Sequence, residues 1–405
     1  MAMITCRSFR LQLGSNMSRV RYLVNGVPQG SVLAPMLFNI YTSDLPCLTS
    51  RKFTYADDIA ILFSHRQKET IENNLSVDLT ILQRYFKDWR LKLSTTKTVS
   101  SYFHLANRLT STELCVKVDG EKIPFEKNRK YLGITLDRTL TYKAHIEGVA
   151  GKVRGRNNLL RRLAGCRWGS DFSVLQTSVL ALSYSTAEYC CPIWSSSYHV
   201  SKIDRALNDG MRLVSGAIKS TPTELLPVLS GILPPDIRRQ KHSLQLLTRA
   251  NSHPNHMLHS RLHREIQHGN TGRLPSRKPL IRRLWEQSQQ QIVVPAETWA
   301  LNTWQDRWNR SQSQLNQFVP QVSTKPTGCD LRRPQWVKLN RLRSGHGRYN
   351  SFLHRIGLAP SPNCTCGEPE TAEHVLRCRV VDIQGNMTTV DDNFRDWICN
   401  TPLDI

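Results

Sequence analysis

The amino-acid sequence predicts an α+β fold, in which a region of strands and helices is followed by a mostly helical region and a small cysteine–histidine module. Three observations predict it. Two β-prone runs flank the acidic pair Asp57 and Asp58, apolar residues recur at helical spacing from residue 66 onward, and cysteine and histidine residues cluster within 364–378. Together with shifts in composition, these features divide the chain into segments 1–140, 141–245, 246–327, 328–380 and 381–405.

Length and charge limit the classes of protein to which this chain can belong. Its 405 residues are enough for two or three domains, and a formal net charge of +23 predicts a polyanionic partner such as nucleic acid. No apolar run is long enough to cross a bilayer, and no secretory signal opens the sequence. We therefore expect an intracellular protein that is not secreted and has no membrane partner, with cysteines that are free and mostly buried.

The acidic pair lies in the sequence Phe-Thr-Tyr-Ala-Asp-Asp-Ile-Ala-Ile-Leu-Phe, residues 53–63. Apolar residues on both sides of a sharp polar break predict a β-hairpin whose turn carries Asp57 and Asp58. Two adjacent carboxylates at an exposed tip repel each other unless a cation lies between them. Oxygen ligands suit Mg²⁺, and a pair of Mg²⁺ ions commonly catalyses nucleotidyl transfer. The simpler alternative is a solvated turn that holds no metal.

A loop rich in glycine and proline precedes the hairpin. It reads Gly-Val-Pro-Gln-Gly-Ser-Val-Leu-Ala-Pro at residues 26–35 and is followed by apolar residues at helical spacing. Bare backbone at the beginning of a helix can approach a template strand or a nucleotide closely. The residues of interest in this loop are Pro28, Gln29, Gly30 and Ser31.

After the hairpin, residues 66 to about 92 predict an amphipathic helix with one apolar stripe. Lys97 follows that helix. Strands are expected near 98–104, 114–118 and 130–136. In the last of these, alternation around Tyr131, Leu132 and Gly133 predicts a strand with one buried face.

The loop at 26–35 and the hairpin at 53–63, in this order and at this spacing, resemble motifs B and C of reverse transcriptases, and more narrowly those of non-LTR (LINE-type, jockey-like) retrotransposons. The resemblance implies that Asp57 and Asp58 hold Mg²⁺ as catalytic residues, and that the loop contacts template or nucleotide through Pro28, Gln29, Gly30 and Ser31. It also implies an RNA template and a DNA primer or target as partners, and a nuclear and cytoplasmic location.

Two further segments extend this resemblance. Residues 91–98 are similar to motif D, which implies that Lys97 is the general acid that protonates the leaving pyrophosphate. The alternative is an ordinary surface lysine after a helix. Residues 129–137 resemble motif E, which implies that Tyr131, Leu132 and Gly133 form the primer grip.

In this family the first metal-binding aspartate comes from motif A, well before the Pro-Gln-Gly loop. The 25 residues that precede Gly26 contain no Asp and no Glu. We therefore expect residues 1–140 to be an incomplete polymerase palm, an antiparallel sheet with helices, that binds Mg²⁺ weakly and has little or no polymerase activity. Residues 141–245 would form a helical thumb and connection.

Basic residues concentrate in one predicted helix within 141–245, and a second basic group lies at 332–348 near Trp336 and Tyr349. Trp168 follows the first group. This mixture predicts contacts to phosphates combined with base stacking. The alternative is a solvated charged surface with aromatic residues in the core. The basic residues of the first group are Lys152, Arg154, Arg156, Arg161 and Arg162.

The cluster Cys364, Cys366, His374 and Cys378 has the pattern Cys-x-Cys-x₇-His-x₃-Cys. Two ligands on a turn and two more one helical turn apart could close a tetrahedral structural Zn²⁺ site, and the alternative is unligated thiols near a helix. The pattern also resembles the C-terminal tail of jockey-type retrotransposon proteins. We expect 328–380 to be this basic zinc-knuckle-like tail, 246–327 a polar linker with helical patches near 284–292 and 299–315, and 381–405 an acidic mobile end.

Two functions follow from these features. The first is an RNA-directed DNA polymerase of a non-LTR retrotransposon, truncated and impaired in polymerisation. The second is a non-enzymatic nucleic-acid-binding remnant of such an element. A third idea, a group II intron maturase, fits the Tyr-Ala-Asp-Asp hairpin but not the cysteine–histidine tail. The sequence leaves the oligomeric state open.

Overall fold

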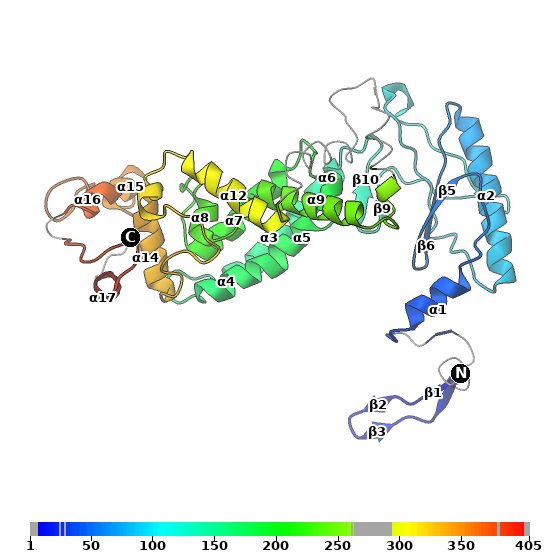
Figure 1. The fold of residues 1–405 in the computed structure, drawn as a ribbon, viewed down its shortest axis with the longest axis horizontal. Helices are drawn as coiled ribbons and strands as arrows, with labels where there is room; N and C mark the ends of the chain where they lie inside the picture. The colour runs from blue at the N-terminus through cyan, green and yellow to red at the C-terminus, as the bar shows by residue number, and fades with distance from the viewer. Residues whose placement is uncertain are drawn as a thin grey trace. The chain divides into compact units, whose positions relative to one another are not determined.

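The computed structural model describes residues 7–23, 26–27, 30–260, 262, 294–378 and 381–400. The chain divides into two compact units, one made of residues 1–129 and 137–140 and the other of residues 130–136 and 141–405. Each unit has hydrophobic clusters of its own. The combination of helices with small antiparallel sheets confirms the α+β class (Figure 1).

The first unit pairs its strands as hairpins: β1 with β4, β2 with β3, β5 with β6, and β7 with β8, all antiparallel. Its strands are β1 (Arg7–Phe9), β2 (Gln12–Leu13), β3 (Asn16–Met17), β4 (Arg21–Leu23), β5 (Arg51–Tyr55), β6 (Asp58–Leu62), β7 (Lys117–Val118) and β8 (Glu121–Lys122). Its helices are α1 (Ala34–Tyr41), α2 (Lys68–Asp88) and the 3₁₀ helix η1 (Asn107–Leu109).

Helix α2 is the scaffold of the first unit. Its buried face contains Ile71, Leu82 and Phe86 at helical spacing, and these pack with residues of the 114–123 segment. The helix predicted for residues 66 to about 92 is therefore confirmed. Trp89 lies just past the helix and is 36% exposed.

The described residues do not join into the single antiparallel sheet expected of a palm. The strand expected at 98–104 is reduced to an isolated bridge between Ser100 and Phe125, and the one at 114–118 to β7. For the 114–118 segment a physical reason lies in α2, whose side chains occupy backbone donors that a neighbouring strand would use. Glu72 accepts from the Cys115 N–H, and Ser76 accepts from the Lys117 N–H.

The second unit is mostly helical. Its only described strand pair is the hairpin β9 (Arg129–Tyr131) and β10 (Ile134–Leu136). Its helices are α3 (Lys143–Arg161), α4 (Phe172–Ser178), the π-helical η2 (Val179–Tyr184), α5 (Ser185–Glu188), α6 (Cys191–Trp194), α7 (Ser201–Ser215), α8 (Leu226–Ser230), α9 (Pro235–Ser252), α12 (Ala296–Asn309), α13 (Leu315–Phe318), α14 (Arg333–Ser344), α15 (Asn350–Arg355), α16 (Ala372–Val375) and α17 (Asp392–Asn400).

The core of the second unit lies between α3 and α7 and continues without a break into the C-terminal helices. Asn157 of α3 is buried, donates to the Ala206 carbonyl of α7 at 2.7 Å and accepts from the Ser183 hydroxyl at 2.7 Å. Trp336 of α14 and Phe394 of α17 belong to the same apolar cluster as the residues of α3 and α7. The C-terminal helices are therefore packed parts of this unit.

Half of the second basic group is buried and does not lie on the surface as expected. Arg333 and Arg343 are each 1% exposed, and Arg341 is 8% exposed. Arg333 donates to the carbonyls of Leu213 and Val214 at the end of α7, where carbonyls lack helical partners. Trp336 and Tyr349 are also buried. The buried arginines stabilise the fold, which corrects the prediction that they contact nucleic acid directly. Arg332 and Arg348 are exposed, and for these two residues nucleic-acid contact stays a prediction.

The end of the chain is also more ordered than its acidic composition suggests. Within 381–400 the helix α17 buries Phe394 and Ile398, because their spacing places both on one apolar face. In the segment expected to be a polar linker, α12 buries Trp304 and Trp308. The helical patch near 284–292 lies outside the described residues.

Ten cysteines of the described residues are free, as expected, but only Cys191 and Cys378 among them are buried. The expectation that most are buried is therefore wrong. None of the described helices combines the length and the apolar composition that a membrane span requires.

Candidate functional site

The hairpin β5–β6 presents the acidic pair at its tip. Tyr55 pairs with Asp58 across the two-residue turn formed by Ala56 and Asp57. Ala56 has a φ of 51°, a left-handed conformation that a tight turn of this kind requires. Asp57 and Asp58 are both exposed, so their carboxylates are accessible to a cation or a phosphate. The hairpin predicted from the sequence is thus present.

Helix α2 holds this hairpin in place through a buried carboxylate. Asp78 is fully buried and accepts from the backbone N–H groups of Thr49, at 3.0 Å, and Ser50, at 2.8 Å, directly before β5. Ile59 and Ile61 of β6 pack against the apolar cluster of α2. Sequence analysis missed Asp78, although a single acid within an apolar helical stripe was a visible signal.

The hairpin alone supplies two carboxylates and no more. Among the described residues, the only group in which three or more Cys, His, Asp or Glu side chains could share one metal ion is the Cys/His cluster of the second unit. Asp57 and Asp58 are therefore suitable as part of a Mg²⁺ site that needs at least one further ligand.

The loop before α1 is only partly described. Pro28 and Gln29 lie outside the described residues, whereas Gly30 and Ser31 lie within them. The Ser31 carbonyl accepts from the Ala34 N–H at 3.2 Å, at the point where α1 begins. Helix α1 itself is apolar and buries none of its residues. Its exposed side chains include Met36 and Ile40, each 61% exposed.

Lys97 lies on an exposed turn after α2. The Ser94 carbonyl closes this turn by accepting from the N–H groups of Lys97, at 3.1 Å, and Thr98, at 2.9 Å. No hydrogen bond or ion pair recorded for the described residues joins Lys97 to Asp57 or Asp58. Its role as a general acid stays a prediction.

The expected primer-grip residues form the turn between β9 and β10 in the second unit. Leu132 and Gly133 both have positive φ, at 43° and 84°. The Tyr189 hydroxyl donates to the Leu132 carbonyl at 3.0 Å. A Cβ on Gly133 would lie 2.9 Å from the Tyr189 ring, so only glycine fits there. Tyr131 ends β9 and is half-buried.

Helix α3 carries the first basic group on its exposed side. Lys152, Arg154, Arg161 and Arg162 are exposed, while the half-buried Arg156 donates to the Leu182 carbonyl. Burial of Val153 and Leu160 on the opposite face fixes this orientation. Four of the five side chains are thus available to phosphates.

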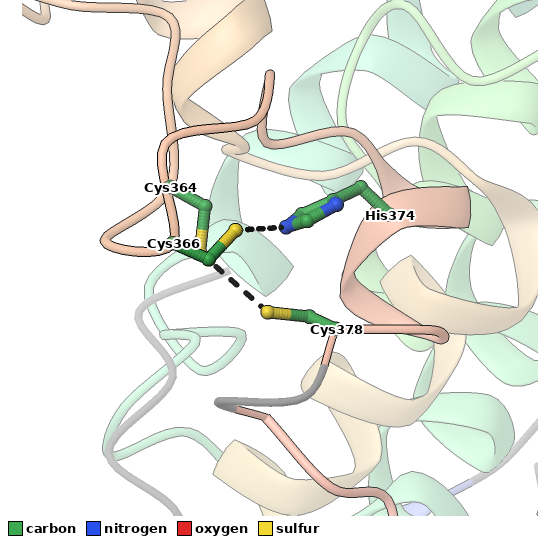
Figure 2. A group of neighbouring side chains, drawn as sticks. All are labelled: Cys364, Cys366, His374 and Cys378. Carbon is green, nitrogen blue, oxygen red and sulfur yellow. Dashed lines mark hydrogen bonds between the residues drawn. The ribbon is translucent and has the colours of Figure 1, made fainter.

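The Cys/His cluster is the most closely assembled of the predicted sites. One ligand atom from each of its four side chains lies within 4.8 Å of the others. Figure 2 shows the four side chains pointing toward one another. The Cys364 and Cys378 sulfurs are 3.9 Å apart, and the Cys366 sulfur is 3.2 Å from Nε2 of His374.

Local structure orients the ligands of this cluster. The Thr371 hydroxyl accepts from the His374 N–H at the beginning of α16, which fixes the histidine. Nδ1 of His374 is 3.0 Å from the Glu368 carboxylate. Hydrogen bonds to the backbone of Cys366 and to His374 lower the pKa of the Cys364 thiol to about 6. Sequence analysis missed Glu368, which follows the second cysteine by only two residues.

Part of the chain is similar to a known protein family. Residues 2–136 match the family described as "Reverse transcriptase (RNA-dependent DNA polymerase)". No solved structure matches the chain.

Related proteins carry names of the same kind. The chain is 33% identical over 198 residues to the "Probable RNA-directed DNA polymerase from transposon BS" of Drosophila melanogaster, covering 46% of this chain and 21% of that protein. It is 25% identical over 385 residues to the "Retrovirus-related Pol polyprotein from type-1 retrotransposable element R1 2" of Nasonia vitripennis, covering 89% of this chain and 87% of that protein.

A third relative is the "RNA-directed DNA polymerase from mobile element jockey" of Drosophila melanogaster, 32% identical over 157 residues, which are 36% of this chain and 17% of that protein. The chain thus spans about a fifth of the transposon BS and jockey polymerases and most of the Nasonia protein. The match over residues 2–136 and these relatives confirm the resemblance, and they identify the chain as a relative of the reverse transcriptases of non-LTR retrotransposons.

Proposed function

We propose that this chain carries the catalytic-hairpin part of an RNA-directed DNA polymerase of a non-LTR retrotransposon. The observation that carries the proposal is the two-residue turn of β5–β6, which presents Asp57 and Asp58 as exposed carboxylates within the segment that matches the family. Lys97 as general acid, the loop at 28–31 as template contact and the β9–β10 turn as primer grip belong to the same proposal.

Mg²⁺ bound by Asp57 and Asp58 would supply charge stabilisation for phosphoryl oxygens. These side chains fit the ion in chemistry and exposure, but they are two ligands where a two-metal site shares three or more carboxylates. We therefore propose weak Mg²⁺ binding and impaired polymerisation.

A non-enzymatic role in nucleic-acid binding is the alternative. The net charge of +23 and the exposed basic side chains of α3 favour it, because they act without any metal. In either case we propose an RNA template and a DNA primer or target as partners, and a nuclear and cytoplasmic location. Affinity for either nucleic acid should fall steeply as salt concentration rises.

Primer extension on an RNA template with Mg²⁺ separates these functions. The comparison uses the intact chain, Asp57→Asn, and the control Asp88→Asn, which neutralises an exposed acid at the end of α2. Synthesis that Asp57→Asn abolishes and Asp88→Asn retains would establish the polymerase. Retained synthesis in Asp57→Asn would refute a catalytic hairpin. Binding of RNA without any synthesis would leave the non-enzymatic role.

For the tail we propose a structural Zn²⁺ site formed by Cys364, Cys366, His374 and Cys378. With Zn–S bonds of about 2.3 Å, two sulfurs of a tetrahedral site lie about 3.8 Å apart. The separation of 3.9 Å between the Cys364 and Cys378 sulfurs agrees with that geometry. The Glu368 carboxylate beside Nδ1 of His374 orients the ring so that Nε2 faces the sulfurs.

Metal analysis of the purified chain tests the zinc site. We expect one zinc per chain, lost in Cys364→Ser and retained in Cys399→Ser, which alters an exposed cysteine outside the cluster. Absence of zinc from the intact chain, or its retention in Cys364→Ser, would refute the assignment.

A further inference from the structure

Trp168 is the most exposed tryptophan of the described residues, with 73% of its surface accessible. It lies in a tight loop between α3 and α4, here named the Trp168 loop and defined as residues 163–170. Backbone hydrogen bonds from Ser170 to the Leu163 carbonyl, at 2.8 Å, and from Gly169 to the Gly165 carbonyl, at 2.9 Å, close the loop. An exposed indole offers a flat apolar face and a polar N–H to a ligand.

The loop holds the indole ring in a fixed position. A Cβ on Gly165 would lie 2.5 Å from Cε2 of Trp168, so the ring packs directly against the backbone at that glycine. A Cβ on Gly169 would lie 2.3 Å from the Gly165 carbonyl oxygen, so the turn also requires glycine there. The ring is thus held against the backbone by one part of its surface while most of it faces solvent. A preorganised ring loses little entropy when a flat ligand stacks on it.

Buried positive charge lies beneath this loop. Arg333 donates to the carbonyls of Ala164 and Gly165, both at 3.4 Å, and Arg341 donates to the Cys166 sulfur at 3.4 Å. Within the described residues, Arg333 forms no ion pair with a carboxylate. Burial lowers the pKa of Arg341, and the charge of Arg348 lowers it further. The exposed Arg348 therefore lies close to Arg341.

The residues next to Trp168 in the sequence are basic as well. Arg161 and Arg162 are exposed at the end of α3, and Arg167 is exposed in the loop itself. The only acid in residues 161–171 is Asp171, which precedes α4. An exposed aromatic ring with exposed arginines close to it in the sequence complements a polyanion that also presents flat, unpaired rings.

We propose that the Trp168 loop is a stacking platform for an unpaired base of single-stranded nucleic acid, with Arg161, Arg162 and Arg167 neutralising the adjacent phosphates. The proposal rests on the nucleic-acid function proposed above and assigns its single-strand contact to this loop. A single strand fits better than a duplex, because paired bases stack on one another and leave no face for the indole. The contact lies within the second unit and needs neither the acidic hairpin nor its metal.

Equilibrium binding of a fluorescent oligothymidylate, measured by anisotropy with the zinc-loaded full chain, tests the platform. Trp168→Ala should weaken binding about tenfold, because one stacked base is worth about 1–3 kcal/mol. For Trp168→Ala, the slope of log affinity against log salt concentration should equal that of the intact chain. Arg162→Ala should instead lower that slope by about 0.7, the share of one phosphate contact. Tyr198→Ala is the matched control, since Tyr198 is 95% exposed in the same unit.

A strand with abasic sites separates stacking from a general loss of structure. The intact chain should bind it about tenfold more weakly than oligothymidylate, Trp168→Ala should bind both strands equally, and Trp168→Phe should recover most of the discrimination. Equal binding of oligothymidylate by Trp168→Ala and the intact chain would overturn the proposal. The proposal would also be overturned if Trp168→Ala lost as much affinity for the abasic strand, or for a blunt duplex, as it loses for oligothymidylate. If the intact chain bound no nucleic acid at all, the function proposed above would fail too.

Discussion

Replacing Asp78 by alanine should loosen the acidic hairpin without touching its carboxylates. Asp78 is fully buried, and its two carboxylate oxygens accept from the Thr49 and Ser50 N–H groups at 3.0 and 2.8 Å. Hydrogen bonds to a charged acceptor contribute about 1.5–3 kcal/mol each, so the pair contributes about 3–6 kcal/mol. Relief of a buried charge offsets part of this. We expect a net loss of about 3 kcal/mol in the local stability of the hairpin.

Hydrogen exchange measured by mass spectrometry reports the loss of local stability in the β5–β6 hairpin. A loss of about 3 kcal/mol corresponds to roughly 100-fold faster exchange of the β5 and β6 amides. The control Asp88→Ala removes an exposed acid from the same helix and should leave exchange within about twofold. Unchanged exchange of β5 and β6 in Asp78→Ala would refute the conclusion that this carboxylate anchors the hairpin.

Three further predictions concern the second unit. Arg333→Met should lower the free energy of unfolding by about 3 kcal/mol in urea titrations. It removes the donor of the Leu213 carbonyl and one of the two donors of the Val214 carbonyl, which then accepts only from the Trp336 indole. Arg348→Met on the surface should change the free energy of unfolding by less than about 0.5 kcal/mol. Gly216→Ala should lower the melting temperature, because Gly216 has a φ of +72° and the added Cβ would lie 2.4 Å from Val337. The control Gly151→Ala, in open space on α3, should raise the melting temperature slightly. Removal of zinc by a chelator should lower the melting temperature of the intact chain but not of Cys364→Ser. The reason is that α16 carries the ligand His374 beside Val375, which belongs to the core. Equal changes of melting temperature in the two proteins would contradict a structural metal.

Periodic patterns account for what the sequence could predict. The alternation on both sides of Asp57 and Asp58 predicted the β5–β6 hairpin, and the apolar stripe through Ile71 and Phe86 predicted α2. The spacing of the cysteines and His374 predicted a cluster that the fold does assemble. Each of these features is local in the sequence, so neighbouring residues suffice to determine it.

Features that depend on distant residues were not predictable in this way. Arg333 and Arg343 are basic residues in a basic segment, and composition alone predicts exposure for both. They can be buried because the backbone carbonyls of Val214 and Met387, far away in the sequence, accept hydrogen bonds from their guanidinium groups. The strand expected at 114–118 is shortened for a similar reason, since α2 side chains accept hydrogen bonds from the Cys115 and Lys117 N–H groups.

Whether the acidic hairpin holds a divalent metal is the most direct test of the account. Mn²⁺ can replace Mg²⁺ at oxygen ligands and is visible by electron paramagnetic resonance. Titrating the zinc-loaded chain with Mn²⁺ should reveal a weak site that Asp57→Asn eliminates and Asp88→Asn leaves unchanged. Equal Mn²⁺ binding by the intact chain and Asp57→Asn would contradict the assignment of β5–β6 as a metal-binding catalytic hairpin.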